Sequence, residues 1–197
     1  MTIGTIILAA GASQRMGQPK QILKIEKGKG LLLKTVETAL ATSLRPVIVV
    51  VGANKAEVVP ELNGLPVTIV DNAFWQEGMA TSVKVGLAGL FMTEPKLDGV
   101  LMLVCDQPYL TAALLNQMVA TFEESGKKAV ACRYKKQWGV PVLIGRDLLA
   151  ELTQIKGDQG AKPLLKKNLK DVAFVDFEQG VIDLDTPGDY AAYLGGE

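Results

Sequence analysis

Residues 8–20 read LAAGASQRMGQPK, and this stretch decides the fold because it follows the strand-like run of residues 5–7 near the start of the chain. Its small residues let backbone N–H groups approach an anion closely, and Arg15 and Lys20 bring positive charge to the same place. The stretch therefore indicates a loop that binds phosphate groups, and so a nucleotide.

Two common nucleotide-binding loops do not fit this spacing. A dinucleotide fingerprint needs G-x-G-x-x-G, whereas the five residues between Gly11 and Gly17 include no glycine. A Walker A loop ends in G-K-[ST], whereas Lys20 follows Gly17 by three positions and Gln21 replaces the metal-binding hydroxyl. The loop argues against a Rossmann dehydrogenase and against a P-loop kinase or GTPase.

Composition narrows the class of protein further. With 197 residues, 48% of them hydrophobic, the chain can bury one sizeable core, and we expect a single domain over residues 1–197. The 21 basic residues balance 21 acidic ones, so we expect no nucleic-acid partner. There is no histidine, which excludes Ser-His-Asp and Cys-His catalysis and histidine-based zinc motifs.

Cellular placement follows from three further features. The apolar runs are strand-sized, far below the roughly 18 residues that a membrane span needs, so no membrane partner is expected. The chain enters a strand directly, without a pattern typical of a signal peptide. Cys105 and Cys132 lie in apolar runs without metal or redox spacing and are interpreted as small buried hydrophobes. Together these features predict a cytoplasmic protein.

Short β-rich runs alternate with helical patterns, which predicts an α/β fold with a mostly parallel sheet. Helices are expected around residues 32–40, 79–90 and 114–122, and Thr186 is placed as the N-cap of a last helix. The expected strands are residues 3–9, 46–51, 67–70, 99–105, 129–133, 140–144, 172–177 and 181–184. In such sheets ligands bind beyond the carboxyl ends of the strands, so the loops there should converge.

Two acidic motifs fall at such loops. The apolar run of residues 99–105 ends in Asp106, and a carboxylate facing a triphosphate would be repulsive without a divalent cation. We therefore expect Asp106 to hold Mg²⁺. Residues 183–187, DLDTP, offer a second metal carboxylate.

The glycine-rich loop resembles the L-A-A-G-x-S-x-R-M-G-x-P-K signature of the MobA-like NTP transferase family, in its branch related to molybdenum cofactor cytidylyltransferase. It matches every specified position. The resemblance extends to Tyr190, through the D-x-D-T-P-x-D-Y motif that begins at Asp183. It implies a three-layer α/β/α, Rossmann-like nucleotidyltransferase fold.

The resemblance also implies roles for individual residues. Arg15 and Lys20 would stabilise charge on the phosphates during transfer, and Asp185 would join Asp106 as a metal ligand. The nucleotide would contact Leu8, Ala9, Ala10, Gly11, Asn72, Gly78 and Ser82. The acceptor would contact Gly139, Asp158 and Lys162, although many relatives carry arginine in place of Lys162 and histidine or asparagine in place of Val140.

The reaction expected from this resemblance is transfer of CMP from CTP to molybdopterin with release of pyrophosphate. Ala10 favours CTP, because the guanylyl branch usually has L-A-G-G there. Three alternatives stay open: GTP or another NTP as donor, a sugar phosphate or methylerythritol phosphate as acceptor, and a carrier that holds nucleotide or molybdenum cofactor without turnover. A molybdoenzyme or its chaperone is the protein partner that the resemblance suggests.

Overall fold

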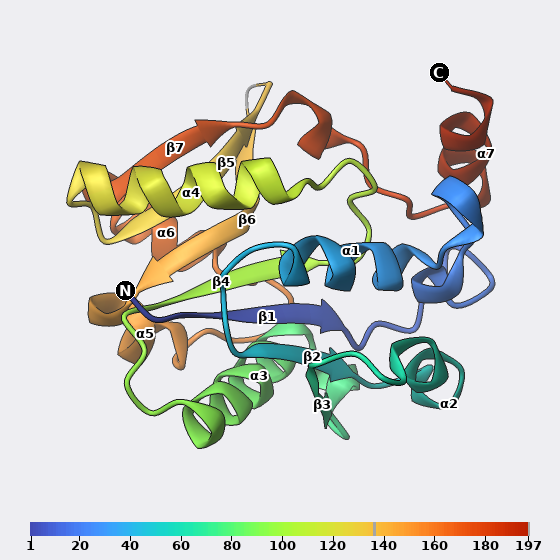
Figure 1. The fold of residues 1–197 in the computed structure, drawn as a ribbon, viewed down its shortest axis with the longest axis horizontal. Helices are drawn as coiled ribbons and strands as arrows, with labels where there is room; N and C mark the ends of the chain where they lie inside the picture. The colour runs from blue at the N-terminus through green and yellow to red at the C-terminus, as the bar shows by residue number, and fades with distance from the viewer. Residues whose placement is uncertain (136, 197) are drawn as a thin grey trace.

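The computed structural model describes residues 1–135 and 137–196. Its centre is a seven-stranded sheet in the order β3-β2-β1-β4-β6-β5-β7 (Figure 1). β6 is antiparallel to β4 and β5, and the other neighbouring strands are parallel. The strands are β1 (Ile3–Ala9), β2 (Val47–Val51), β3 (Thr68–Asp71), β4 (Gly99–Val104), β5 (Ala129–Tyr134), β6 (Gln137–Gly145) and β7 (Val172–Asp176). The expected mostly parallel sheet is confirmed.

Helices cover both faces of the sheet, which gives the expected three layers. Side chains of α1 and α4 pack on one face, and those of α3, α5 and α6 pack on the other. The α-helices are α1 (Leu31–Leu40), α2 (Lys55–Val58), α3 (Met79–Thr93), α4 (Ala112–Ser125), α5 (Arg146–Leu152), α6 (Lys162–Lys167) and α7 (Pro187–Gly195). Among the described residues, no helix is both long and apolar enough to span a bilayer.

Alternation along the strands explains the two core layers. In β1 the side chain of Ile6 joins the α3 side of the core and that of Ile7 joins the α1 side. All seven residues of β1 are buried, as are all five of β2, which is typical of central parallel strands covered on both faces. Cys105 and Cys132 are buried and unpaired, as expected.

The expectation of a strand at residues 181–184 is wrong. Residues 178–181 form a 3₁₀ turn, η6 (Glu178–Val181), and the chain then runs to α7 without pairing in the sheet. Its apolar side chains have another use, because Leu184 is fully buried against Ile25 and Leu31, away from the main core. The last helix begins as expected, with a capping box between Thr186 and Asp189.

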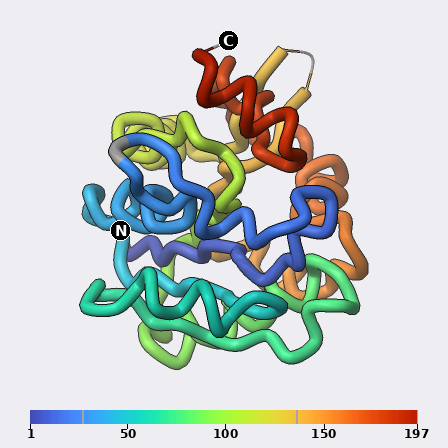
Figure 2. The backbone as a smooth tube through the Cα atoms, turned by 90° about the vertical axis from the view of Figure 1, so that its right-hand side faces the viewer, coloured from blue at the N-terminus to red at the C-terminus, as the bar shows by residue number. Residues whose placement is uncertain are grey.

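The carboxyl ends of the parallel strands β1, β2 and β4 lie on one side of the molecule, which faces the viewer in Figure 2. There α7 lies apart from the sheet, beside the segment that follows the glycine-rich loop. The Tyr190 hydroxyl donates to the Lys24 carbonyl, and the Tyr193 hydroxyl lies 3.4 Å from Glu26 Oε1. The fold thus brings the beginning and the end of the chain together at this edge.

Candidate functional site

The loop after β1 is held from inside by Gln21. The Gln21 amide nitrogen donates to the carbonyl oxygens of Ala9 and Gly11, each at 2.9 Å. The Ser13 hydroxyl accepts a hydrogen bond from the Lys20 backbone N–H at 3.1 Å, and Ser13 adopts a left-handed φ of +55°. These bonds give the loop a fixed shape in the structure, although its glycine and alanine residues carry little or no side chain.

Four charged side chains gather beside this loop. Lys20 Nζ lies 2.6 Å from Asp106 Oδ2 and 2.9 Å from Asp185 Oδ1. Arg15 Nη2 lies 2.9 Å from Asp185 Oδ2, so both oxygens of Asp185 contact a cation. The predicted catalytic cations and the predicted metal carboxylates thus form one cluster, built from residues 170 positions apart in the case of Arg15 and Asp185.

The cluster is shielded from solvent on the Lys20 side. The Lys20 side chain is 16% exposed and that of Arg15 is 72% exposed. Burial alone would lower the pKa of Lys20, but the charge of Asp106 and hydrogen bonds to both carboxylates outweigh it, so the pKa is raised above its ordinary value. Lys20 is therefore a permanent cation at neutral pH.

Asp106 has one oxygen to spare. Its Oδ1 is buried and has no hydrogen-bond partner among the described residues. A buried carboxylate oxygen without a donor is costly, and one remedy is an additional ligand at that oxygen. The described residues contain no group of three or more metal-ligating side chains, so a cation here would complete its shell with water or phosphate oxygens. Mg²⁺ is usually bound in that way, with one or two carboxylates and several waters or phosphate oxygens.

Asp185 is held in place by the start of α7. Asp189 Oδ2 accepts hydrogen bonds from the backbone N–H of both Asp185 and Thr186. The neighbouring Leu184 N–H donates to the backbone carbonyl of Asp106 at 2.9 Å. This backbone bond ties the two acidic segments together, so the loop after β4 and the segment before α7 converge as expected.

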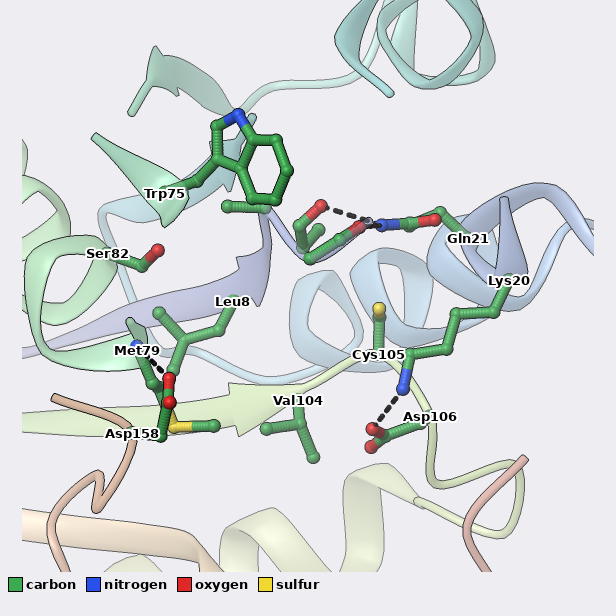
Figure 3. A pocket seen from close by; sticks show the side chains of 13 residues that line it. Leu8, Lys20, Gln21, Trp75, Met79, Ser82, Val104, Cys105, Asp106 and Asp158 are labelled. Atoms are coloured by element: carbon green, nitrogen blue, oxygen red, sulfur yellow. Dashed lines mark hydrogen bonds and ion pairs between the residues drawn. The ribbon is translucent and has the colours of Figure 1, made fainter. Parts of the chain in front are cut away.

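A cavity of about 210 Å³ opens between the glycine-rich loop, the end of β4 and α3 (Figure 3). Leu8, Ala9, Ala10, Gly11, Lys20, Ser82 and Asp106 are the residues assigned to donor, metal or catalytic roles that line it. Trp75, Met79, Gln21 and Cys105 also line it, although the sequence did not assign them to the site. Burial raises the pKa of Cys105 to about 12, so its thiol stays protonated at neutral pH.

Asn72 and Gly78 support the cavity wall and do not line it. Asn72 is fully buried, and its amide nitrogen donates to the hydroxyls of Thr81 and Ser82, each at 2.9 Å. Gly78 has a φ of +106°, and a Cβ there would lie 2.7 Å from the carbonyl carbon of Gly157. The structure therefore places both residues behind the contact surface that they were expected to form.

Asp158 connects the two sides of the site. Its Oδ1 accepts a hydrogen bond from the Met79 N–H at 3.1 Å, and the adjacent Gly157 carbonyl accepts from the Ala80 N–H at 2.9 Å. These bonds satisfy two of the free N–H groups at the start of α3. Asp158 thus closes the first turn of the helix that carries Ser82.

A second cavity, of about 190 Å³, lies next to the first, and Leu8, Met79 and Asp158 line both. Its walls include all three residues expected on the acceptor side: Gly139, Asp158 and Lys162. Lys162 Nζ lies 5.8 Å from the centre of the Trp138 ring, within the range of a cation–π contact. The second cavity therefore combines an aromatic face with a positive charge, both in reach of a ligand.

Comparison with known proteins agrees with this arrangement. A family model described as the MobA-like NTP transferase domain matches residues 5–172. The chain belongs to the MobA-like NTP transferase family. The match includes the glycine-rich loop, Asp106 and both cavities, and it ends before Asp185.

Three curated relatives of this MobA-like chain carry different names. Nicotine blue oxidoreductase of Paenarthrobacter nicotinovorans is 29% identical, over 92% of this chain and 91% of its own. Purine catabolism protein PucB of Bacillus subtilis is 29% identical, over 94% and 92%. Molybdenum cofactor cytidylyltransferase of Escherichia coli is 25% identical, over 95% and 93%. The family is therefore clear, whereas the relatives' names do not agree on one substrate.

Solved structures confirm the fold. Rv0371c of Mycobacterium tuberculosis superposes with a TM-score of 0.85 at 27% identity, covering 99% of this chain and 98% of that one. A complex of Rv0371c with manganese superposes with a TM-score of 0.79 at 25% identity, and each chain is covered completely. The nucleotidyltransferase fold expected for this MobA-like chain is thus established, and one of its structural relatives is a complex with manganese.

Proposed function

We propose that this nucleotidyltransferase transfers CMP from CTP to the phosphate of a molybdopterin-type acceptor and releases pyrophosphate. The observation that carries the proposal is the position of the Lys20, Arg15, Asp106 and Asp185 cluster at a cavity that shares a wall with a second, aromatic cavity. Two adjacent cavities, one of them beside a charged cluster, suit a reaction between two bound substrates.

This reaction requires the protein only to position the two substrates and to stabilise negative charge. An acceptor phosphate monoester is ionised at neutral pH, so its oxygen can attack the α-phosphorus of the NTP without a general base. Negative charge then develops on the leaving pyrophosphate, and Lys20 and Arg15 lie where they would stabilise it. A site without histidine can therefore run this reaction.

Asp106 and Asp185 are the residues that we propose for Mg²⁺, and the unpartnered Oδ1 of Asp106 supports this choice. When bound, the metal would neutralise charge on the phosphate oxygens. In the structure the same carboxylates contact Lys20 and Arg15. We infer an exchange of partners, in which the triphosphate takes over the two cations and thereby frees the carboxylates.

The choice of CTP rests on Ala10, which is 5% exposed and lines the first cavity. The choice of acceptor rests on the relative named molybdenum cofactor cytidylyltransferase and on the second cavity, where Trp138 could stack on a flat ring and Lys162 could pair with an anionic group. A molybdoenzyme or its chaperone would be the recipient of such a product. We propose the cytoplasm as the compartment of this nucleotidyltransferase.

Pyrophosphate release tests the proposal directly. The purified protein would be incubated with Mg²⁺ and each of CTP, GTP, ATP and UTP, with and without molybdopterin, and with a sugar phosphate and methylerythritol phosphate as alternative acceptors. We expect release that needs both CTP and molybdopterin. Turnover with GTP and with no other NTP would contradict the choice of base. Turnover with another acceptor would contradict the choice of acceptor. Nucleotide binding without turnover in every combination would favour the carrier.

A further inference from the structure

Gln21 directly follows Lys20 and is 1% exposed. Its amide nitrogen donates to the Ala9 and Gly11 carbonyls at 2.9 Å, and its Oε1 lies 3.3 Å from the Ser13 hydroxyl, which donates to it. A glutamine amide has two hydrogens, so both are already used within the loop. Gln21 therefore has no hydrogen left to donate to a ligand, although it lines the first cavity.

These bonds fix the direction of the peptide groups in the loop. In a trans peptide the carbonyl of one residue and the N–H of the next point in opposite directions. With the carbonyls of Ala9 and Gly11 held by Gln21, the N–H groups of Ala10 and Ala12 point away from it. The carbonyl between them, that of Ala10, accepts from the Ala53 N–H at 3.1 Å. Three successive carbonyls thus have protein donors.

The direction of these carbonyls matters for an anion. A carbonyl oxygen carries partial negative charge and repels phosphate oxygens, whereas an N–H group attracts them. A loop of small residues can adopt many conformations, in some of which a carbonyl would face the phosphates. The side chain of Gln21 selects against those conformations.

Gln21 also contributes to the position of Lys20. The Ser13 hydroxyl donates to Gln21 Oε1 and accepts from the Lys20 N–H, so a chain of hydrogen bonds joins the two limbs of the loop. Lys20 extends from this anchored backbone to Asp106 at 2.6 Å. Loss of Gln21 would therefore disturb both the peptide groups and the base from which Lys20 reaches the cluster.

We propose that Gln21 is a positioning residue for triphosphate binding, which holds the carbonyls of the loop away from the phosphates and leaves its N–H groups free to receive them. This inference rests on the proposed nucleotidyl transfer, because it requires that the loop binds the phosphates of an NTP. It assigns a role to a side chain that would touch neither the base nor the reacting phosphorus.

The test compares Gln21→Met with Gln107→Met. Gln107 is a matched control, since it is 3% exposed and its amide nitrogen also donates to two carbonyls, those of Val140 and Gly180. Binding of magnesium CTP and of magnesium tripolyphosphate would be measured by titration calorimetry, and thermal stability by circular dichroism. Tripolyphosphate isolates the phosphate contacts from those of the base.

We expect both substitutions to lower the melting temperature, because each removes two side-chain hydrogen bonds to backbone carbonyls. Gln21→Met should raise the Kd of both ligands by about tenfold or more, which corresponds to a loss of roughly 1.4 kcal/mol of binding free energy. Gln107→Met should change binding of both ligands by less than about threefold, because its hydrogen bonds go to Val140 and Gly180 and not to the glycine-rich loop. In turnover, Gln21→Met should raise KM for the NTP and leave KM for the acceptor unchanged. If Gln21→Met does not fold, Ser13→Ala takes its place, because it breaks the hydrogen-bonded link to Lys20. This variant should also weaken the binding of both magnesium CTP and magnesium tripolyphosphate.

Four results would overturn the inference. Unchanged binding by Gln21→Met, or equal weakening in Gln107→Met, would show that the side chain contributes to stability alone. Loss of CTP binding with tripolyphosphate binding intact would show that Gln21 acts on the base. Failure of the wild-type protein to bind any NTP or tripolyphosphate would contradict the proposed function itself and would remove the basis of the inference with it.

Discussion

Lys20 and Asp106 form an ion pair of 2.6 Å at the edge of the first cavity, and the same ammonium group lies 2.9 Å from Asp185. A cation supplied by the chain thus lies between the two carboxylates that we propose for the metal. This relationship links the two halves of the proposed mechanism, since whatever binds Lys20 also changes the charge available at Asp106 and Asp185.

Removal of Lys20 should therefore separate metal binding from turnover. Lys20→Met should lower kcat/KM for nucleotidyl transfer by about 100-fold or more, because charge on the leaving pyrophosphate loses a donor. The same variant should bind Mn²⁺ about tenfold more tightly without nucleotide, since Asp106 loses its cation and Asp185 keeps only Arg15. Free Mn²⁺ would be measured by electron paramagnetic resonance. Lys24→Met is the control, because Lys24 pairs with Glu61 and its side chain is 54% exposed. Unchanged or weaker Mn²⁺ binding by Lys20→Met would contradict the exchange of partners.

Asp106→Asn should weaken metal binding, whereas Lys20→Met should strengthen it. The amide keeps the shape of the side chain but loses the charge, so we expect Mn²⁺ binding and pyrophosphate release both to fall by about 100-fold. Asp176→Asn is the control, because Asp176 pairs with Arg133 and both side chains are more than half exposed. If Asp106→Asn released pyrophosphate at the rate of the control, the assignment of Asp106 to the metal would be wrong.

Gly78→Ala tests how the wall of the first cavity is held. The substitution forces an L side chain to a φ of +106° and brings its Cβ within 2.7 Å of Gly157 and of Asp158 Oδ1. We expect a loss of stability of about 2 kcal/mol or more together with weaker CTP binding, because the start of α3 must move. Gly64→Ala is the matched control, since Gly64 has a φ of +80° but nothing within 4 Å of the added carbon. Denaturant unfolding of both variants would compare strain plus collision with strain alone. Equal losses would show that the contact with Gly157 has no effect.

Lys162→Met tests the second cavity. The substitution removes the charge over the Trp138 ring while keeping a long side chain. If the acceptor binds there, its KM should rise by about fivefold or more while KM for the NTP stays the same. Steady-state kinetics with each substrate varied in turn would measure this. A change in KM for the NTP alone would place Lys162 on the donor side.

Asp183 gives a prediction for stability against pH. Partial burial, followed by the charges of Asp106 and Asp185, raises the pKa of Asp183 to about 6 from an ordinary value of 3.8. Because the folded-state pKa is the higher one, its contribution to stability is present below pH 3.8 and is lost as the pH rises through about 6. Asp183→Asn should remove this loss and stabilise the fold at pH 8, by less than about 1 kcal/mol since solvent screens the carboxylate. Thermal melts from pH 4 to pH 8 would check the sign, and a variant less stable than wild type at pH 8 would contradict it.

Much of the fold could be predicted from the sequence because its signals are local. The buried runs that become β1, β2 and β4 are continuous and apolar, and Thr186 and Asp189 form the capping box that the DTP motif indicates. Residues 181–184 show where such signals fail. Their apolar side chains suit a strand, yet the chain leaves the sheet there, and Leu184 packs instead beside α7. Pairing depends on a free neighbouring strand, which a local pattern does not reveal.

The candidate site could likewise be predicted only in part: the sequence indicates many of the residues that belong to it, but not the contacts between them. A motif could assign Lys20, Asp106 and Asp185 to one site, but it could not predict that the lysine would contact both carboxylates, because those contacts span 86 and 165 residues. In the sequence Gln21 stands where a Walker A loop has its metal-binding hydroxyl. Its bonds to Ala9 and Gly11 form only when the loop has folded back on itself. Asn72 was expected at the nucleotide, and its amide is instead used on the hydroxyls of Thr81 and Ser82.

The most direct test of nucleotidyl transfer at this site follows the two ends of the triphosphate separately. CTP labelled with ³²P at the α-phosphate or at the γ-phosphate would be incubated with the protein, Mg²⁺ and molybdopterin, and the products separated. We predict that the α-label moves to the molybdopterin product and that the γ-label leaves in pyrophosphate, with both events lost in Asp106→Asn. Release of the γ-label as inorganic phosphate, or an α-label that stays in CTP or appears only as free CMP, would contradict the account.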